Sequence, residues 1–431
     1  MAEIRPFRGI RYNPRKAGDL SLNVCPPFDV ITPALQRDLY ERSEYNIVRL
    51  ELARRGLGDD PYASAAETQR GWVKSGALQR DEEPSVYVTE ESFTFRGRDY
   101  VRRGFVTAVR IEEYDRSIIL PHENTRPEWV ADRVRLMEAA KSNYSPLLVL
   151  FRDDLRSSVG AILRAVAGGD PTAVANPPDM PSMRMWRVTD PGTLEVLART
   201  LADSQVFIAD GHHRYEAAMR YRSRIRSDRE VAAGESINHR MMLLVSVDEP
   251  GLMTRGYHRT VEGASGGELE ALRQAVREQC DVEPWTPPPG ATNGVVADAF
   301  AEVLGERQGS EVMFGVIGYG PGSYHIARLK SPPPAENALQ NSEYSRVHDL
   351  VLRRAFSAER ENEVVSFQHD TARVMECVRQ DEVQMAFIMR PVPMSEFIGI
   401  VTRGWRLPPK ATNFYPKPPA GSVIQTLEGE L

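Results

Sequence analysis

The densest run of chemically reactive side chains in the sequence follows a short apolar segment. Val206 to Ala209 is typical of a buried strand, and the chain then reads Asp210-Gly211-His212-His213-Arg214 before a helical pattern begins at Tyr215. A helix that starts directly after a strand presents unpaired backbone N–H groups and the positive end of its dipole. Because this arrangement binds anions, the run predicts a phosphate site at the carboxyl end of the strand.

The side chains of this run fit the same chemistry. Gly211 lets the backbone approach a ligand closely, and His213 and Arg214 offer donors to phosphate oxygens. Asp210 is a candidate Mg²⁺ ligand, because Mg²⁺ is held by one or two carboxylates together with phosphate oxygens. The alternative is structural, since Asp is a preferred N-cap, Gly is common at such a junction and adjacent histidines are often simply solvated.

A second candidate follows another apolar segment, in Leu120-Pro121-His122-Glu123-Asn124-Thr125-Arg126-Pro127. Glu123 beside His122 is a candidate acid/base pair, because a carboxylate near a positioned histidine can take a proton from a hydroxyl group. The alternative is an exposed loop in which the His-Glu dipeptide has no chemical role.

A third candidate is the proline-rich stretch between Trp405 and Val423. Lys410 and Lys417 lie here, and they are two of only six lysines in the chain. The prolines exclude a regular helix and predict a loop. Either the two lysines reach the phosphates of a ligand, or they mark a polar surface loop. Candidates to bind a substrate carboxylate are Arg49, Arg133 and Arg259.

Strand-like and helix-like patterns alternate along the chain and predict a mixed α/β or α+β fold. Extended segments are predicted at 85–89, 93–95, 100–111, 116–121, 146–151, 206–209, 241–247, 311–318 and 384–389. Helices are predicted at 67–78, 128–142, 157–167, 215–226, 267–279, 295–304, 345–356 and 371–379. Loops rich in proline and glycine are predicted at 168–181, 284–294 and 331–334.

Composition narrows the classes of function. The 431 residues carry 54 Lys+Arg against 60 Asp+Glu, a net charge of −6, which argues against broad binding of nucleic acid. No apolar run has the length of a membrane span, and the first residues do not resemble a signal peptide. Cys25, Cys280 and Cys377 are too few and too far apart for a disulfide framework, so a cytoplasmic protein is expected. Composition leaves the oligomeric state open.

The combination "LPHENTRP … IADGHHRYEAA" resembles the ParB/sulfiredoxin superfamily, and most of all its free-serine kinase branch. The resemblance covers roughly residues 110–230. It implies a nucleotide-binding core with ATP or ADP and Mg²⁺, in which Glu123 is the catalytic glutamate and His122 orients the acceptor. It also implies that Asp210, Gly211, His212, His213 and Arg214 bind the nucleotide phosphates and the metal. Lys410 and Lys417 are then further candidates for that nucleotide site.

Departures from the superfamily limit this resemblance. His212 stands where sulfiredoxins have their catalytic cysteine, so sulfinic-acid reduction is not expected. The Gly-Glu-Arg-Arg nucleotide motif of ParB is absent from the sequence. Glu123 and Asp210 are 87 residues apart (210 − 123), and the segment at about 153–200 is expected to be an insert that reshapes the substrate pocket.

Over its full length the chain is similar to a large bacterial family known only as domain of unknown function 1015. The similarity rests on Cys25-Pro26-Pro27-Phe28-Asp29, on Asn46-Ile47-Val48-Arg49-Leu50, on the two segments above, on Tyr257-His258-Arg259 and on Leu407 through Lys417. Three regions are expected: an N-terminal α+β region at 1–110, a nucleotide-binding core at 111–235 and a C-terminal α/β region at 236–431.

The sequence therefore favours a small-molecule kinase, a phosphotransferase that acts on an alcohol group. The predicted acceptor is free L-serine or a similar hydroxyl compound, which would give O-phosphoserine. One alternative is a regulatory protein that binds a nucleotide and catalyses nothing. Another is a metal-dependent hydrolase with ligands drawn from His122, Glu123, Asp210, His212 and His213, although adjacent histidines rarely chelate one ion.

Overall fold

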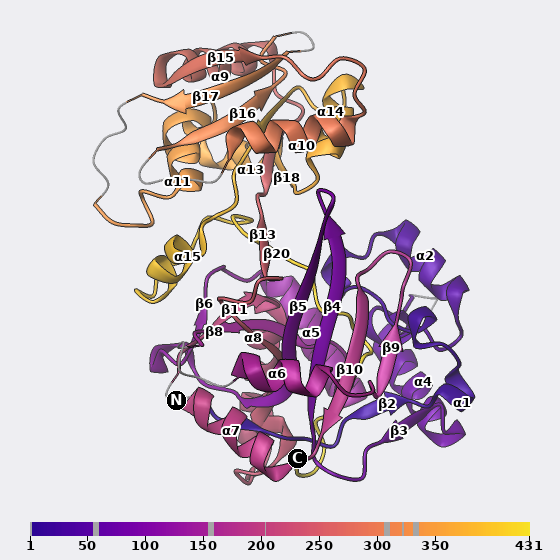
Figure 1. Ribbon diagram of the computed structural model, residues 1–431. Helices are drawn as coiled ribbons and strands as arrows, with labels where there is room; N and C mark the ends of the chain where they lie inside the picture. The colour runs from indigo at the N-terminus through magenta and orange to yellow at the C-terminus, as the bar shows by residue number, and fades with distance from the viewer. Residues whose placement is uncertain are drawn as a thin grey trace. The chain divides into compact units, whose positions relative to one another are not determined.

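The chain folds into two units, each built around its own β-sheet (Figure 1). The computed structural model describes residues 2–54, 60–153, 159–202, 204–305, 311–320, 323–330 and 336–431. The first unit comprises Met1–Met253 together with Pro416–Leu431, and the second comprises Thr254–Tyr415. Within these described ranges, no helix has the length and apolar character needed to cross a membrane.

The first unit contains a nine-stranded mixed sheet. Its strand order is β6-β11-β8-β12-β5-β4-β10-β9, and β1 pairs with β5 away from this path. The pairs β6–β11 and β8–β12 are parallel, whereas β11 runs antiparallel to β8. The strands are β1 (Ile4–Arg5), β4 (Val86–Phe95), β5 (Arg98–Arg110), β6 (Ile119–Pro121), β8 (Leu147–Phe151), β9 (Ala173–Ala175), β10 (Ser182–Val188), β11 (Val206–Asp210) and β12 (His239–Ser246).

Four helices pack on one face of this sheet. Alternate strand residues such as Val149 and Ile208 point to that face and form one core with Val130, Leu201 and Tyr215 of the helices. The continuous apolar run of β8 is buried throughout, as expected for a strand inside a covered sheet. The helices are α5 (Pro127–Ala140), α6 (Val159–Ala167), α7 (Pro191–Ala202) and α8 (His212–Asp228).

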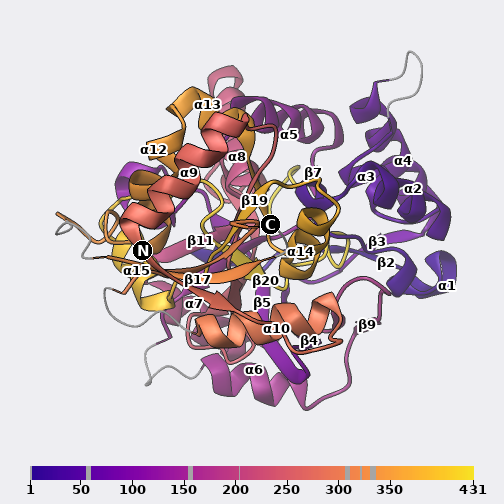
Figure 2. The same cartoon turned by 90° about the horizontal axis from the view of Figure 1, so that it is seen from above.

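A second core joins the two ends of the chain. The N-terminal helices lie together at one side of the first unit (Figures 1 and 2) and pack against Leu136 and Ala140 of α5. Ala420 and Ile424 belong to the same core, so the last residues return to the first unit. The elements are β2 (Ile10–Tyr12), α1 (Pro14–Ala17), α2 (Pro33–Arg42), α3 (Val48–Glu51), α4 (Pro61–Ser75), β3 (Leu78–Arg80), and β7 (Ser142–Asn143), which pairs with β21 (Gln425–Thr426).

The second unit has a six-stranded antiparallel sheet in the order β15-β17-β16-β19-β14-β18. Helices α10 and α14 share a core with this sheet. The strands are β14 (His258–Val261), β15 (Cys280–Trp285), β16 (Met313–Ile317), β17 (Tyr324–Leu329), β18 (Val365–Gln368) and β19 (Met385–Ile388). The helices are α9 (Gly266–Gln279), α10 (Asn293–Leu304), α11 (Glu343–Val347), α12 (Arg353–Ala355), α13 (Ala358–Val364), α14 (Thr371–Arg379) and α15 (Met394–Val401). A separate pair joins β13 (Met253–Arg255) to β20 (Asn413–Tyr415).

The mixed α/β class predicted from the sequence is confirmed, with differences in detail. The extended segments predicted at 85–89 and 93–95 are one strand, β4, and the loop predicted at 168–181 contains β9. The helix predicted from Tyr215 begins three residues earlier, at His212. Two elements inside the predicted insert, β10 and α7, have no counterpart in the sequence analysis. The loop predicted at 331–334 lies outside the described residues.

The division into units also differs from the three expected regions. Strand β5, from the expected N-terminal region, pairs with β12, which begins in the expected C-terminal region. The first 253 residues therefore form one sheet and its helices, and residues 254–415 form a separate unit between two segments of the first.

Candidate functional site

The turn from β11 into α8 requires a glycine. Gly211 has φ +100°, a left-handed conformation that L side chains rarely adopt. A Cβ atom at this position would lie 2.4 Å from Cδ2 of Leu147. Gly211 is the N-cap of α8 and supplies no side-chain cap, so the helix begins with His212, His213 and Arg214 in its first turn. The N-terminus of α8 is thus placed directly at the carboxyl end of a buried strand.

The two histidines of this first turn hold the loop that follows β6. Nε2 of His212 accepts a hydrogen bond from the backbone N–H of His122 at 3.2 Å. Nε2 of His213 accepts from the backbone N–H of Arg126 at 2.9 Å, and its ring packs on Trp129. Both histidines therefore act as acceptors toward the two ends of the 122–126 loop. Their ring nitrogens Nε2 are committed to protein groups and do not serve as phosphate donors in this arrangement.

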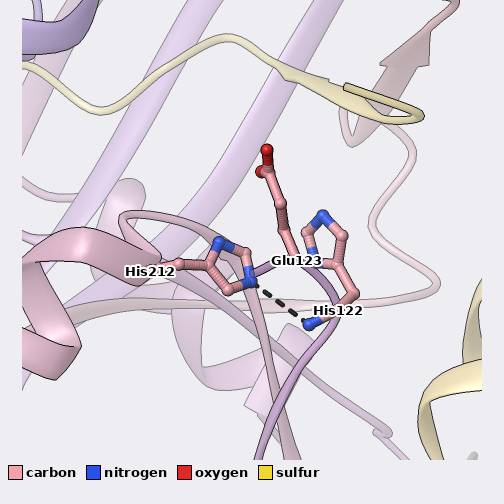
Figure 3. A group of neighbouring side chains, drawn as sticks. All are labelled: His122, Glu123 and His212. Atoms are coloured by element: carbon pink, nitrogen blue, oxygen red, sulfur yellow. Dashed lines mark hydrogen bonds between the residues drawn. The ribbon is translucent and has the colours of Figure 1, made fainter. Parts of the chain in front are cut away.

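Glu123 lies between these two anchored ends. A carboxylate oxygen of Glu123 and ring nitrogens of His122 and His212 all lie within 4.8 Å of one another. Figure 3 shows the three side chains, with the hydrogen bond from the His122 backbone to His212. Glu123 is half-buried, and both histidines are buried. The structure therefore brings the Glu123 carboxylate to the N-terminus of α8, close to His212. The two residues belong to separate segments of the sequence.

The ring of His122 is anchored to β11. Its Nδ1 lies 2.7 Å from the backbone carbonyl oxygen of Ile208. A carbonyl oxygen only accepts, so Nδ1 carries the proton and Nε2 carries the lone pair of the neutral ring. This hydrogen bond fixes both the tautomer and the orientation of the ring beside Glu123.

The three groups have a spacing that can hold a metal ion, but one of them is already engaged. Because His212 accepts through Nε2, its other ring nitrogen carries the proton in the neutral tautomer. Ligation by His212 would require that bond to break or that proton to leave. The arrangement therefore disfavours a closed metal centre formed by His122, Glu123 and His212, and the metal-dependent hydrolase draws little support from it.

Asp210 is the centre of a network of charged side chains. Its Oδ2 accepts from Arg214 at 2.8 Å, and its Oδ1 pairs with the ammonium of Lys417. The Lys417 ammonium also lies 3.6 Å from Oδ2 of Asp29. Lys417 comes from the C-terminal proline-rich stretch, and Asp29 from the Pro26–Pro27 segment near the N-terminus. Three distant segments of the sequence therefore meet at the end of β11.

The same network engages the guanidinium of Arg214 in hydrogen bonds within the protein. Its side chain is buried, and it donates to Oγ of Ser145 at 2.8 Å and to the carbonyl oxygen of Pro146 at 2.9 Å, besides Asp210. Arg214 is thus turned toward the protein interior. Lys417 is the more accessible cation, with a side chain that is 18% exposed.

Asp210 does not fit a magnesium ligand as the site is arranged. Mg²⁺ requires near-ideal octahedral geometry and oxygen ligands free to approach it closely. Both oxygens of Asp210 already accept from cationic donors. The positive charge beside Asp210 comes from Arg214 and Lys417 instead.

The remaining predicted residues have contacts of their own. Lys410 belongs to the second unit, where its ammonium lies 5.5 Å from the ring centre of Tyr257. Arg259, also in the second unit, is fully buried and donates to the carbonyl oxygen of Lys410. Arg49 donates to the carbonyl oxygen of Tyr40 at 2.7 Å. The role predicted for Lys410 at the nucleotide site stays a prediction.

Sequence reasoning missed two groups that matter here. Ser145 links Arg214 to Glu51, through hydrogen bonds at 2.8 and 3.0 Å. Arg240 of β12 donates to the backbone carbonyl oxygen of Ser145 at 2.9 Å. An isolated serine and an arginine within an apolar strand pattern carry no motif, and only the alignment of β8 with β12 brings them together.

Fold and site define a mixed α/β protein with a polar centre at the N-terminus of α8. The model of the family described as "Protein of unknown function (DUF1015)" matches residues 4–352, so the chain belongs to this family. No curated protein sequence matches the chain significantly.

The solved structures that match this chain share little sequence with it. They include a conserved hypothetical protein from Pyrococcus furiosus, with 14% identity and a TM-score of 0.33, which covers 69% of this chain and 87% of that one. A free serine kinase in complex with AMP has 16% identity and a TM-score of 0.32, covering 69% of this chain and 83% of that one. SbnI with a C-terminal truncation, from Staphylococcus aureus, has 13% identity and a TM-score of 0.35, covering 72% of this chain and 82% of that one. Similarities this low support no function.

Proposed function

We propose that the protein is a small-molecule kinase that transfers a phosphoryl group from ATP or ADP to a hydroxyl group. The observation that carries the proposal is the position of the Glu123 carboxylate, within 4.8 Å of a ring nitrogen of His212 at the N-terminus of α8. A general base and an anion-binding helix end thus lie side by side. Free L-serine is the favoured acceptor, because the His-Glu and Asp-Gly-His-His-Arg segments resemble those of free-serine kinases.

Each group has a definite part in this reaction. The backbone N–H groups at the start of α8 and the Lys417 ammonium bind the phosphates of the nucleotide. Glu123 takes the proton from the acceptor hydroxyl, and the oxygen attacks the terminal phosphorus atom of the nucleotide. The bond from that phosphorus to its bridging oxygen breaks, so ATP leaves as ADP, or ADP leaves as AMP. His122, held by Ile208, orients Glu123 and the acceptor.

The proposal is tested with the purified full-length chain. It is incubated with ATP or ADP, with and without Mg²⁺, and with a panel of hydroxyl compounds that includes L-serine; products are identified by mass spectrometry. We expect O-phosphoserine from the wild type and none from Glu123→Gln, with nucleotide binding retained. Glu128→Gln is the matched control, because Glu128 is exposed in the first turn of α5. No phosphorylated product with either nucleotide would refute the kinase.

The pairing of Lys417 with Asp210 favours a second candidate, a regulatory protein that binds nucleotide without catalysis. Phosphates that attract Lys417 compete with Asp210 and Asp29 for the same ammonium. A nucleotide would then alter how the C-terminal segment is held against β11 without any chemical step. This candidate predicts that nucleotides raise the Tm of the protein while none of the acceptors yields a product. The Glu123→Gln variant should bind nucleotide as the wild type does.

A further inference from the structure

A small cavity lies beside Arg214 in the first unit. Its walls come from α3, α5, the segment from β7 to β8, α8 and β12, and its volume is about 20 Å³. A single water molecule needs about 10–15 Å³, so the cavity has room for a small polar group. Its polar lining consists of Glu51, Arg133, Ser145, Arg214 and Arg240 together with the polar groups of residues 142–144.

The lining carries three guanidinium groups and one carboxylate. Two of the guanidiniums have acidic partners outside the cavity: Nε of Arg133 donates to Asp132 at 2.7 Å, and Arg214 donates to Asp210. The carboxylate of Glu51 lies 3.9 Å from Nη1 of Arg133 and accepts from Ser145. Arg240 is the guanidinium that has no ion pair among the described residues of the cavity wall.

The hydrogen bonds of Arg240 are incomplete. The residue is 3% exposed, and its Nη2 donates to the carbonyl oxygen of Ser145. Within the part of the chain that the structure describes, its Nε and Nη1 have no acceptor. Burial, and next the positive charge of Arg214, lower the pKa of Arg240 to about 9 although the negative charge of Glu51 opposes them, so the guanidinium is still charged at neutral pH. A buried cation with unpaired donors is costly unless an acceptor or an anion reaches it.

We propose that this cavity binds one small carboxylate, held by the Arg240 guanidinium and neighbouring donors of the cavity wall. Guanidinium groups match carboxylates in shape and charge, and a carboxylate offers acceptors where Arg240 lacks them. A bound carboxylate would also lie against Arg214, whose other hydrogen bonds reach Asp210. The proposal concerns binding alone and does not depend on the kinase.

The experiment measures binding of ¹³C-formate to the full-length wild type by NMR, and the Tm of the protein in formate against chloride at equal ionic strength. We expect saturable formate binding and a saturable rise in Tm. Arg240→Gln should weaken formate binding by about tenfold or more, because hydrogen bonds to charged groups are among the strongest in proteins. Arg222→Gln is the matched control: Arg222 is also buried in this unit, but it pairs with Glu113 and the carbonyl oxygen of Ile111.

Further arms separate the sources of the carboxylate. If L-serine competes with formate in the wild type, the carboxylate belongs to a bound amino acid; if it does not, the site takes a free carboxylate. Arg240→Lys keeps the charge with fewer planar donors and should bind formate more weakly than the wild type, which decides the question if Arg240→Gln does not fold. No saturable formate binding in the wild type, an equal effect of chloride, or unchanged affinity in a folded Arg240 variant would overturn the proposal.

Discussion

The ammonium of Lys417 forms an ion pair with Asp210, a residue 207 positions earlier in the chain. Asp29, still nearer the N-terminus, lies 3.6 Å from the same ammonium. This pair links the C-terminal segment to the end of β11, directly before the glycine that starts α8. The charge of Lys417 therefore lies at the end of β11, where the proposed kinase would bind the phosphates of its nucleotide.

Removing this charge should weaken nucleotide binding. We expect Lys417→Met to lower nucleotide affinity about tenfold or more, because charge-assisted hydrogen bonds contribute about 1.5–3 kcal/mol. Isothermal titration calorimetry with ATP and ADP measures the effect. Lys74→Met, on the exposed side of α4, is the control that should change nothing. An unchanged affinity in Lys417→Met would remove Lys417 from the site, and Lys410→Met in the same assay tests the remaining lysine predicted from the sequence.

The hydrogen bond that the loop donates to His213 predicts a catalytic effect without a binding effect. His213→Ala removes the acceptor for the Arg126 backbone N–H and loosens one end of the loop that carries Glu123. If the protein is a kinase, kcat should fall by about 10²-fold, the cost of a small misplacement of a catalytic group, with the nucleotide Kd unchanged. His369→Ala, an exposed histidine of the second unit, is the control. The opposite result, a weakened Kd with kcat intact, would restore the phosphate-binding role that the sequence predicted for His213.

The conformation of Gly211 predicts a large effect from a single methyl group. Gly211→Ala places a Cβ at φ +100° and 2.4 Å from Leu147, so we expect a loss of about 1–3 kcal/mol in the free energy of unfolding. Urea denaturation measures the loss. The control is Gly71→Ala in α4, where a Cβ meets nothing within 4 Å, and where alanine should be neutral or stabilising by up to about 1 kcal/mol. Equal stability of the two variants would contradict the strain assigned to the turn.

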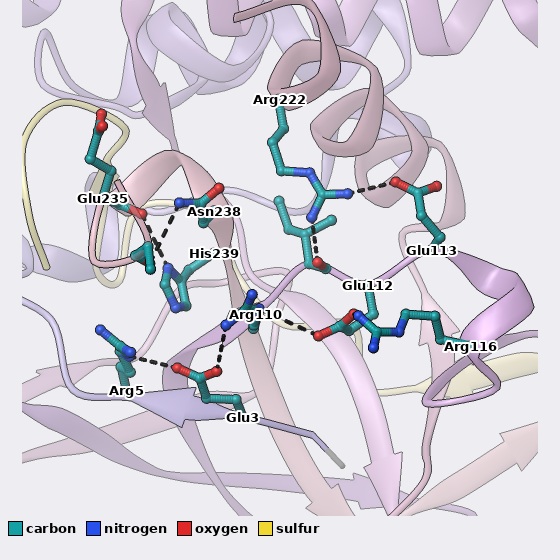
Figure 4. Close-up of polar contacts among 12 residues, drawn as sticks. Glu3, Arg5, Arg110, Glu112, Glu113, Arg116, Arg222, Glu235, Asn238 and His239 are labelled. Carbon is teal, nitrogen blue, oxygen red and sulfur yellow. Dashed lines mark hydrogen bonds and ion pairs between the residues drawn. The ribbon is translucent and has the colours of Figure 1, made fainter. Parts of the chain in front are cut away.

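The environment of His239 predicts a loss of stability in acid. Burial is the main cause that lowers the pKa of His239 from 6.5 to about 4, and the positive charges of Arg5 and Arg110 lower it further (Figure 4). The hydrogen bond to the backbone of Glu235 and the charge of Glu3 oppose this decrease. At a pH between 4 and 6.5, His239 is protonated in the unfolded chain but not in the folded chain. The free energy of unfolding contributed by His239 is therefore present above pH 6.5 and is lost as the pH falls toward 4.

The size of this loss is about 3 kcal/mol by pH 4, since one pKa unit corresponds to about 1.4 kcal/mol. Urea unfolding of the wild type and of His239→Gln at several pH values between 7 and 4 measures it. The variant should show a flatter dependence on pH across this window, whereas His369→Gln should follow the wild type. Parallel curves for the wild type and His239→Gln would contradict the assignment.

Much of the fold follows from local patterns in the sequence. The apolar run of β8 and the periodic apolar residues of α5 predict these elements within one or two residues, because burial imposes the pattern on the sequence itself. The elements β10 and α7 were missed because they lie next to the proline-rich stretch at 168–181, where breaker residues dominate the local signal. The return of the last 16 residues to the first unit could not be predicted, since no local pattern encodes a contact across more than 200 residues.

At the site, too, the sequence indicates individual segments but not the contacts between distant residues. The segments that contain Glu123 and Asp210 could be found in the sequence because glycine, histidine and carboxylate residues cluster after apolar strands. The sequence offers Lys417 only as one of two candidate lysines, because its pairing with Asp210 is a tertiary contact, and Ser145 carries no motif of its own. The histidines of the Asp-Gly-His-His-Arg run have donor and acceptor atoms alike, and only the structure shows that His212 and His213 accept from the backbone.

The return of the C-terminal segment also sets the order in which the site is assembled during synthesis. A ribosome releases the N-terminal end first, so the sheet of the first unit and both Asp29 and Asp210 emerge long before Lys417. Throughout that interval the two carboxylates lack their shared lysine, and the whole second unit must be translated before it arrives. The nascent chain therefore lacks the charge balance of the finished site until Lys417 has been translated.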